Sequence, residues 1–153
     1  MEKILIATDG SPSAREAIEV GLELAAEQEA EVAFVHVVPV LDRSFVDGIG
    51  VPAAMPHRIG DVDRKPLEEA LGLAAEHHVE AKAELLSGFP ADEIVTYADT
   101  IDADLIVVGS RGHGALATML LGSVSRGVLH EARRPVLVVR GAAVPVAEPV
   151  ATG

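Results

Sequence analysis

Five short apolar segments alternate along this chain with four segments that repeat small apolar residues at helical spacing. The five apolar segments are Lys3–Thr8, Glu31–Val38, Glu80–Leu86, Ala103–Val108 and Pro135–Arg140. Short runs that are apolar almost throughout are typical of strands buried on both faces, and their alternation with helices favours a covered parallel sheet. The sequence therefore predicts a single α/β domain of Rossmann-like type, with an open five-stranded parallel sheet and helices on both faces.

The predicted helices have recognisable first residues. Ser11 followed by Pro12 fits a capping residue and a first helical position. The later helices are expected at 66–78, where Pro66 opens the helix, and at 90–101 and 123–132. The segment 40–65 has no sustained period and is expected to be a long irregular loop. Glu80–Leu86 alternates in polarity, which indicates a strand at an edge of the sheet.

The chain is strongly acidic, with a net charge of −12 from 24 acidic and 12 basic residues. Such a surface repels nucleic acids and anionic membranes, and an aromatic content of 3% provides no stacking platform for single strands. The scarcity of Lys is typical of proteins from salt-loving organisms, although an ordinary acidic protein fits as well. The sequence contains no cysteine, so no disulfides are expected. It also shows neither a signal-peptide pattern nor an apolar run of membrane-spanning length, so we expect a cytoplasmic protein.

A glycine pattern follows the fourth apolar segment: Gly109 and Gly112, separated by two residues, and then Gly122 and Ser123 after nine more. Glycines leave backbone N–H groups uncovered and a helix N-terminus directs further N–H groups to one point, so the pattern suits a polyphosphate. It is neither a P-loop nor a dinucleotide fingerprint. Asp9 follows the first apolar segment, and both turns would line one crevice if the first and fourth strands are neighbours.

These residues resemble those of the universal stress protein family, in the subgroup that binds ATP. The glycine pattern matches the family motif Gly-x2-Gly-x9-Gly-Ser/Thr, and the flanking sequences ILIATDGSPSA and RPVLVVR are similar too. The resemblance covers about Lys3–Arg140 and, together with the acidic composition, is to a halophilic archaeal member. It implies a fold like that of the adenine nucleotide alpha hydrolases, a family domain over 1–141 and a flexible tail over 142–153.

The resemblance also implies nucleotide-binding roles, and Arg111, inside the glycine segment, is a further candidate for a phosphate contact. The implied residues are Ala7, Thr8, Asp9, Val37, Gly109, Gly112, Gly122, Ser123 and Val124. Asp9 and the two residues before it would meet the ribose or the adenine edge, and Val37 would pack on adenine. The glycines would let backbone amides approach the ribose and phosphates, and Gly122 to Val124 would hold phosphates at a helix N-terminus.

Local chemistry accounts for some of these residues without any ligand. Asp9 could serve only as a turn residue, Ser123 only as a helix cap, and Arg111 only as a solvated charge. His36, in the second apolar segment, is expected to pack in the core.

A nucleotide-dependent regulatory or binding module in the stress response is favoured over an enzyme. The glycine segment contains no Lys, and no acidic pair marks a metal site. ATP would bring its own Mg²⁺ or Mn²⁺, with any metal ligands of the protein unassigned. One alternative is a slow ATP hydrolase using the same cleft, for which His113 is the only proton-transfer candidate near the phosphates. The other is an interaction protein that binds no nucleotide.

The fifth apolar segment bears on protein partners. The resemblance implies a homodimer that pairs through Val136–Val139, and an exposed apolar edge strand would otherwise invite aggregation. An internal strand of a monomer is the alternative. Neither nucleic acid nor a membrane is expected as a partner.

Overall fold

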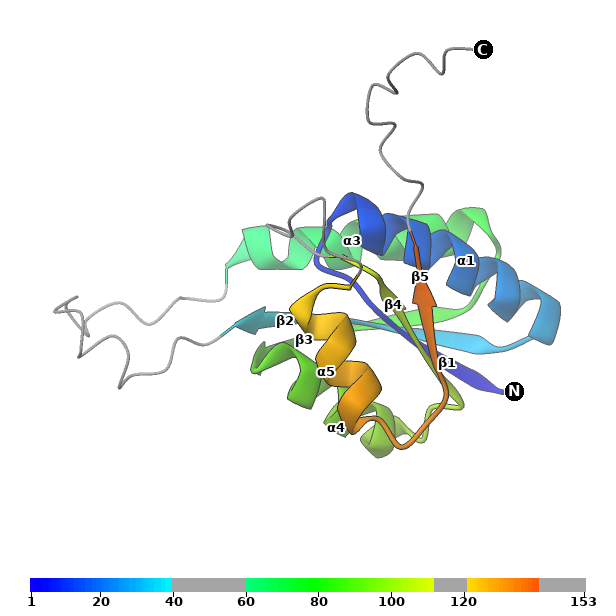
Figure 1. Ribbon diagram of the computed structural model, residues 1–153. Coiled ribbons are helices and arrows are strands. Elements are labelled where there is room, and N and C mark those ends of the chain that lie inside the picture. Colours follow the sequence, from blue (N-terminus) through cyan, green and yellow to red (C-terminus); the bar gives the residue numbers. More distant parts are fainter. Residues whose placement is uncertain (40–59, 112–120, 141–153) are drawn as a thin grey trace, which may run out of the picture.

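The computed structural model describes residues 1–39, 60–111 and 121–140, in which strands and helices alternate (Figure 1). The elements are β1 Lys3–Ala7, α1 Pro12–Gln28, β2 Glu31–Pro39, α3 Asp61–Glu76, β3 Ala81–Gly88, α4 Pro90–Ile101, β4 Leu105–Gly109, α5 Ser123–Glu131 and β5 Val136–Val139. All strand pairs are parallel, and the order in the sheet is β3-β2-β1-β4-β5. The predicted α/β fold with a five-stranded parallel sheet is confirmed.

The side chains of β1 show why helices cover both faces of the sheet. Ile4 and Ile6 pack in a cluster with residues of α1 and α3, whereas Leu5 packs in a second cluster with residues of α4 and α5. All three side chains have an exposed fraction of 0%. Burying each contributes about 1.5–3 kcal/mol, so the alternation along the strand requires a helical layer on either side. Figure 1 shows α1 and α3 on one face and α4 and α5 on the other.

Helix α3 begins at Asp61, well before Pro66, so the prediction that Pro66 opens this helix was wrong. The Asp63 carboxylate accepts the Gly60 N–H at 2.9 Å, and the Asp63 N–H donates to the Gly60 carbonyl at 3.0 Å. This reciprocal cap, with an acidic first turn near the positive end of the helix dipole, stabilises an earlier start. Pro66 is instead internal and leaves one helical hydrogen bond unmade.

Strands β3 and β5 lie at the two edges of the sheet. The edge position predicted for the third strand is confirmed. An internal position for the fifth strand is contradicted, because β5 pairs with β4 alone among the described strands. The predicted tail over 142–153 lies outside the described residues, as does most of the loop predicted over 40–65.

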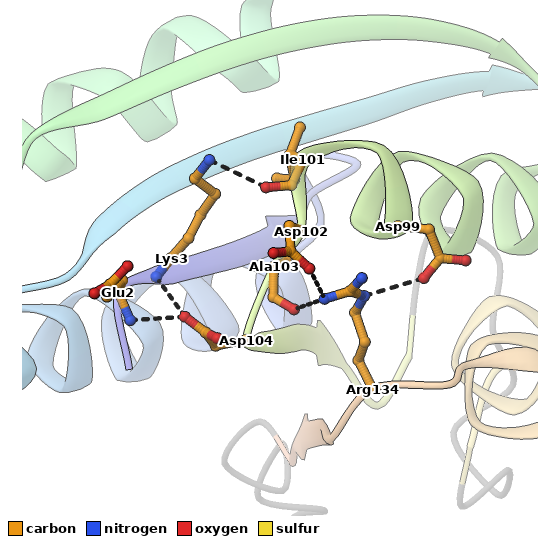
Figure 2. A network of polar contacts seen from close by, with 8 residues as sticks. All are labelled: Glu2, Lys3, Asp99, Ile101, Asp102, Ala103, Asp104 and Arg134. Atoms are coloured by element: carbon orange, nitrogen blue, oxygen red, sulfur yellow. Dashed lines mark hydrogen bonds and ion pairs between the residues drawn. The ribbon is translucent and has the colours of Figure 1, made fainter.

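Hydrogen bonds hold the amino-terminal ends of the strands together (Figure 2). The Asp104 carboxylate accepts the N–H of Glu2 at 2.7 Å and that of Lys3 at 3.0 Å, and these bonds lower the pKa of Asp104. Arg134 in turn donates to three acceptors in the last turn of α4 and the turn that follows it. They are the carboxylates of Asp99 and Asp102 and the carbonyl of Ala103. These contacts fix the chain where it enters β1, β4 and β5. No helix within the described ranges is both long and apolar enough to cross a bilayer.

Candidate functional site

A cleft of about 800 Å³ opens at the carboxyl ends of β1, β2 and β4. It brings together every predicted site residue that the structure describes. These residues are Ala7, Thr8, Asp9, Val37, Gly109, Arg111, Gly122, Ser123 and Val124. Gly112, the remaining prediction, lies outside the described residues. Because β1 lies between β2 and β4, the turns that follow β1 and β4 meet at one crevice, as the sequence predicted.

Part of the cleft wall is apolar. Val35 and Val37 of β2, Val108 of β4 and Ile94 of α4 line it and belong to one core cluster. Val37 is only 8% exposed, so its side chain is held in place by its neighbours. A firm apolar surface of this kind suits one face of a planar ring.

The turn after β1 is held by its own hydrogen bonds. Asp9 Oδ1 accepts the Ser11 N–H at 2.9 Å, Thr8 Oγ1 accepts the Gly10 N–H at 3.2 Å, and Gly10 has a φ of 79°. Ser11 then caps α1 by accepting the Ala14 N–H at 3.1 Å, as predicted. The local turn role considered for Asp9 is therefore present, and it holds the carboxylate in the cleft wall.

The start of helix α5 forms the opposite part of the cleft. Gly122 is the cap residue, with extended φ and ψ of −76° and 169°, and Ser123 is the first helical residue. The alternative in which Ser123 serves only as the helix cap is therefore wrong. The first intrahelical bond runs from the Arg126 N–H to the Gly122 carbonyl at 3.1 Å. The N–H groups of the first turn precede this bond, and Ser123 and Val124 line the cleft there.

Gly109 is required by a contact that the sequence did not reveal. A Cβ atom at this position would lie 2.7 Å from both the carbonyl oxygen and Oγ of Ser13, at the start of α1. Ser13 Oγ also accepts the Arg111 N–H at 3.1 Å. Glycine at position 109 thus lets α1 pack closely on the end of β4, whatever further role it has towards a ligand. Ser13 sits in the SPSA sequence, where it was indistinguishable from an ordinary helix-start residue.

His36 and Lys65 are among the cleft residues that the sequence did not predict. His36 was predicted to pack in the core, but it is half-buried and lines the cleft, with Nδ1 at 2.8 Å from the Thr8 carbonyl oxygen. Lys65 reaches the cleft because α3 begins at Asp61 and presents its first two turns there. The sequence placed Lys65 at the end of an irregular loop, so neither residue carried a signal.

The charged groups of the described cleft lining are mixed. The basic side chains are Arg111 and Lys65, and the acidic side chains are Asp9, Asp63 and Glu69. Across the parts of the chain that the structure describes, no three acidic, His or Cys side chains gather as a metal site. The cleft therefore offers backbone N–H groups, two cationic side chains and three carboxylates, of which Asp9 lies at a turn, and the N–H groups and cations suit a nucleotide.

Comparison with known proteins agrees with this geometry. The profile of the Universal stress protein family matches residues 1–140. A universal stress protein of Methanocaldococcus jannaschii is 37% identical over 139 residues, which cover 91% of this chain and 82% of that protein. The universal stress protein YxiE of Bacillus subtilis is 40% identical over 145 residues, which cover 90% of this chain and 98% of that protein.

Two solved structures are similar to this chain throughout and were determined with nucleotides. A universal stress protein in complex with cAMP has a TM-score of 0.67 and 26% identity, covering 92% of this chain and 98% of that one. The universal stress protein from Archaeoglobus fulgidus in complex with dAMP has the same TM-score and identity, covering 90% of this chain and 97% of that one.

Proposed function

We propose that this chain, which belongs to the universal stress protein family, binds an adenine nucleotide in the cleft at the carboxyl ends of β1, β2 and β4. The observation that carries the proposal is the meeting of an apolar wall, the Asp9 turn and the start of α5 in one cleft. Two relatives of the same fold were solved with cAMP and with dAMP. Both ligands contain adenine, a ribose or deoxyribose and one phosphate.

The cleft has a place for each part of such a ligand. The adenine ring would pack on Val37 and its apolar neighbours, and the Asp9 carboxylate would accept a hydrogen bond from the ribose or the base. The phosphates would lie at Gly122, Ser123 and Val124, where the N–H groups of the first helical turn and the helix dipole favour negative charge. Neighbouring strands of a sheet lie about 4.8 Å apart. A ligand that extends from the start of α5 to the end of β2 therefore crosses the end of β1 and passes Asp9.

ATP is the nucleotide that we propose for this cleft in the cell. Arg111 supplies a cation in the segment that follows β4, and the glycine pattern continues to Gly112, outside the described residues. The described carboxylates do not gather as a metal site by themselves. Mg²⁺ or Mn²⁺ would therefore arrive on the phosphates, because Mg²⁺ commonly binds substrate phosphates and keeps several waters as its remaining ligands. The metal would neutralise phosphate charge.

The cleft would act by holding a nucleotide rather than by hydrolysing it. The described lining presents no lysine beside the start of α5, and Lys65 approaches from α3, on the opposite face of the sheet. The apolar β5 strand lies at an edge of the sheet, and we propose that it pairs with its counterpart in a homodimer. The dimer would present two cleft mouths to a partner in a stress-response pathway.

The test is whether the purified protein carries or binds an adenine nucleotide. Heat-denatured protein should release one on chromatography, and calorimetry with nucleotide-free protein should give one site per chain for ATP with Mg²⁺. Binding at 100 times the dissociation constant should stabilise the fold by about 2.7 kcal/mol. Absence of both release and binding would contradict the proposal, and steady release of ADP from ATP would favour the hydrolase alternative.

A further inference from the structure

His36 differs from the other cleft residues because one of its two ring nitrogens already makes a hydrogen bond within the protein. Nδ1 lies 2.8 Å from the carbonyl oxygen of Thr8. A carbonyl oxygen only accepts hydrogen bonds, so Nδ1 must be the donor, and the neutral ring carries its proton there. The other ring nitrogen, Nε2, then presents a lone pair. The Thr8 carbonyl thereby selects the tautomer in which His36 is an acceptor towards the cleft.

The one hydrogen bond that His36 makes with the described residues is at Nδ1, so Nε2 has no partner among them. It is not sealed in the core either, because no buried side-chain nitrogen or oxygen of the described residues lacks a partner, and His36 is only half-buried. Since His36 lines the cleft, Nε2 is available there to a ligand. Side chains alternate along β2, so His36 lies on the face of the sheet covered by α1 and α3, opposite to Val35 and Val37. There it adds a neutral acceptor to a part of the cleft that α3 lines with charged side chains. A single acceptor in a cleft can select among ligands of similar shape.

The position of His36 assigns this acceptor to the base end of the ligand. His36 precedes Val37 on β2, and β2 is separated from the phosphate-binding start of α5 by β1. Thr8, which orients the ring, precedes Asp9 at the proposed ribose position. A nucleotide with phosphates at Ser123 would therefore bring its base, not its phosphates, to His36.

The nucleotides bound by the two relatives narrow the choice of the ligand group that could donate a hydrogen bond to His36 Nε2. The cyclic phosphate of cAMP occupies its 3′-oxygen, and dAMP has no 2′-hydroxyl, so these ligands share no sugar hydroxyl donor. The hydrogen-bond donor that both retain is the 6-amino group of adenine. We propose that His36 Nε2 accepts a hydrogen bond from this amino group and that His36, oriented by the Thr8 carbonyl, selects adenine over purines that lack a donor at position 6. This inference rests on the proposed nucleotide function.

The test removes each side of the proposed bond in turn. AMP and purine riboside 5′-monophosphate, which differ only in the 6-amino group, are titrated into the unaltered protein and into His36→Phe in mildly alkaline buffer. The unaltered protein should bind AMP about tenfold more tightly, the range expected for one hydrogen bond in a partly buried site. His36→Phe should lose that ratio, with affinity falling for AMP and changing little for the deaminated nucleotide. His130→Phe, on the exposed end of α5, should keep the ratio.

The outcomes separate this inference from the proposed function. If the unaltered protein binds both nucleotides equally well, the nucleotide function stands and the role of His36 is overturned, whether or not the variants fold. Equal losses of affinity for both nucleotides in His36→Phe would show that the ring only supports the Thr8 turn. This result would also overturn the proposed role of His36 in selecting adenine. His36→Gln provides a second variant, which should reduce the ratio because its amide can present either a donor or an acceptor. Failure of the unaltered protein to bind AMP would overturn both proposals.

Discussion

The carbonyl of Ser110 accepts the N–H of Gly122 at 2.6 Å, which joins the start of helix α5 to the end of strand β4. Ser110 is 2% exposed, and its own N–H donates to the Val139 carbonyl of β5 at 2.9 Å. One residue thus connects the proposed phosphate site to the edge strand. The N–H groups of α5 are held in position before any ligand arrives, so little ordering is required when it binds.

Ser125 provides a test of this junction. Its hydroxyl lies 3.2 Å from the Ser110 carbonyl and 3.0 Å from the Gly122 carbonyl, and the side chain is 2% exposed. Ser125→Ala should lower the free energy of unfolding by about 1 kcal/mol, measured by urea denaturation, because buried acceptors lose a donor. Ser123→Ala removes an exposed hydroxyl from the same turn and should change stability by less than about 0.5 kcal/mol while weakening nucleotide binding. Equal stabilities for the two variants would contradict this account.

Gly122 is the residue at which a side chain should interfere most directly with the ligand. Its extended φ and ψ are compatible with valine, and a branched side chain on this buried residue would crowd the N–H groups at the proposed phosphate site. We expect the rise in melting temperature produced by ATP to disappear. Gly72→Val is the matched control, since a Cβ at Gly72 meets nothing within 4 Å. An unchanged ATP-dependent rise in a folded Gly122→Val protein would show that the phosphates bind elsewhere.

Asp104 should make stability depend on pH in the acidic range. Hydrogen bonds from the Glu2 and Lys3 N–H groups lower its pKa below the ordinary value of 3.8. The folded state therefore favours the ionised carboxyl, and this stabilisation is present above the unfolded-state pKa and is lost as the pH falls through the lower folded-state value. Asp104→Asn should be less stable than the unaltered protein at neutral pH, and the difference in urea midpoint should shrink on acidification. Glu16→Gln, on the exposed face of α1, should show no such convergence; a constant difference for Asp104→Asn would refute this reading.

The edge of β5 that pairs with no described strand allows a test of the dimer through a backbone group. The carbonyls of Pro135 and Val139 accept bonds from β4, so the backbone groups of Val138 point to the open edge. Proline is tolerated at such an edge position, so Val138→Pro should fold yet fail to pair with a second copy. Light scattering after size exclusion should give a dimer for the unaltered protein and a monomer for this variant. Val138→Thr retains the N–H and should remain dimeric, and a Val138→Pro dimer would place the interface on another surface.

Much of the architecture was predictable because buried positions appear in the sequence as apolar residues at the spacing of a strand or a helix. Ile4, Leu5 and Ile6 are apolar in succession since helices cover both faces of β1, and this pattern is visible without any structure. Ser11 and Pro12 mark the start of α1 through side-chain and φ preferences that act within a few residues. The start of α3 was missed because the reciprocal bonds between Gly60 and Asp63 compete with a strong proline signal, and their geometry decides the outcome.

The cleft was predictable only in part. The glycine pattern and the Asp9 turn could be placed near each other because carboxyl ends of neighbouring parallel strands meet at one edge of a sheet. Gly109 lines the cleft as expected for a predicted site residue, but its contact with Ser13 depends on how α1 crosses the end of β4. His36 was misplaced because an apolar strand context predicts burial, whereas this residue lies near the carboxyl end of β2 and lines the cleft.

The sequence by itself therefore determined the order of strands and helices along the chain, the parallel sheet and the segments that line the cleft, because each depends on burial periodicity or on bonds between near neighbours. The tertiary structure decided which groups face one another: His36 with Thr8, Ser13 with Gly109, and Ser110 with both Gly122 and Val139. These contacts join residues from different elements, and their partners depend on strand order and helix packing. No local pattern records them, since they arise only when the sheet has formed.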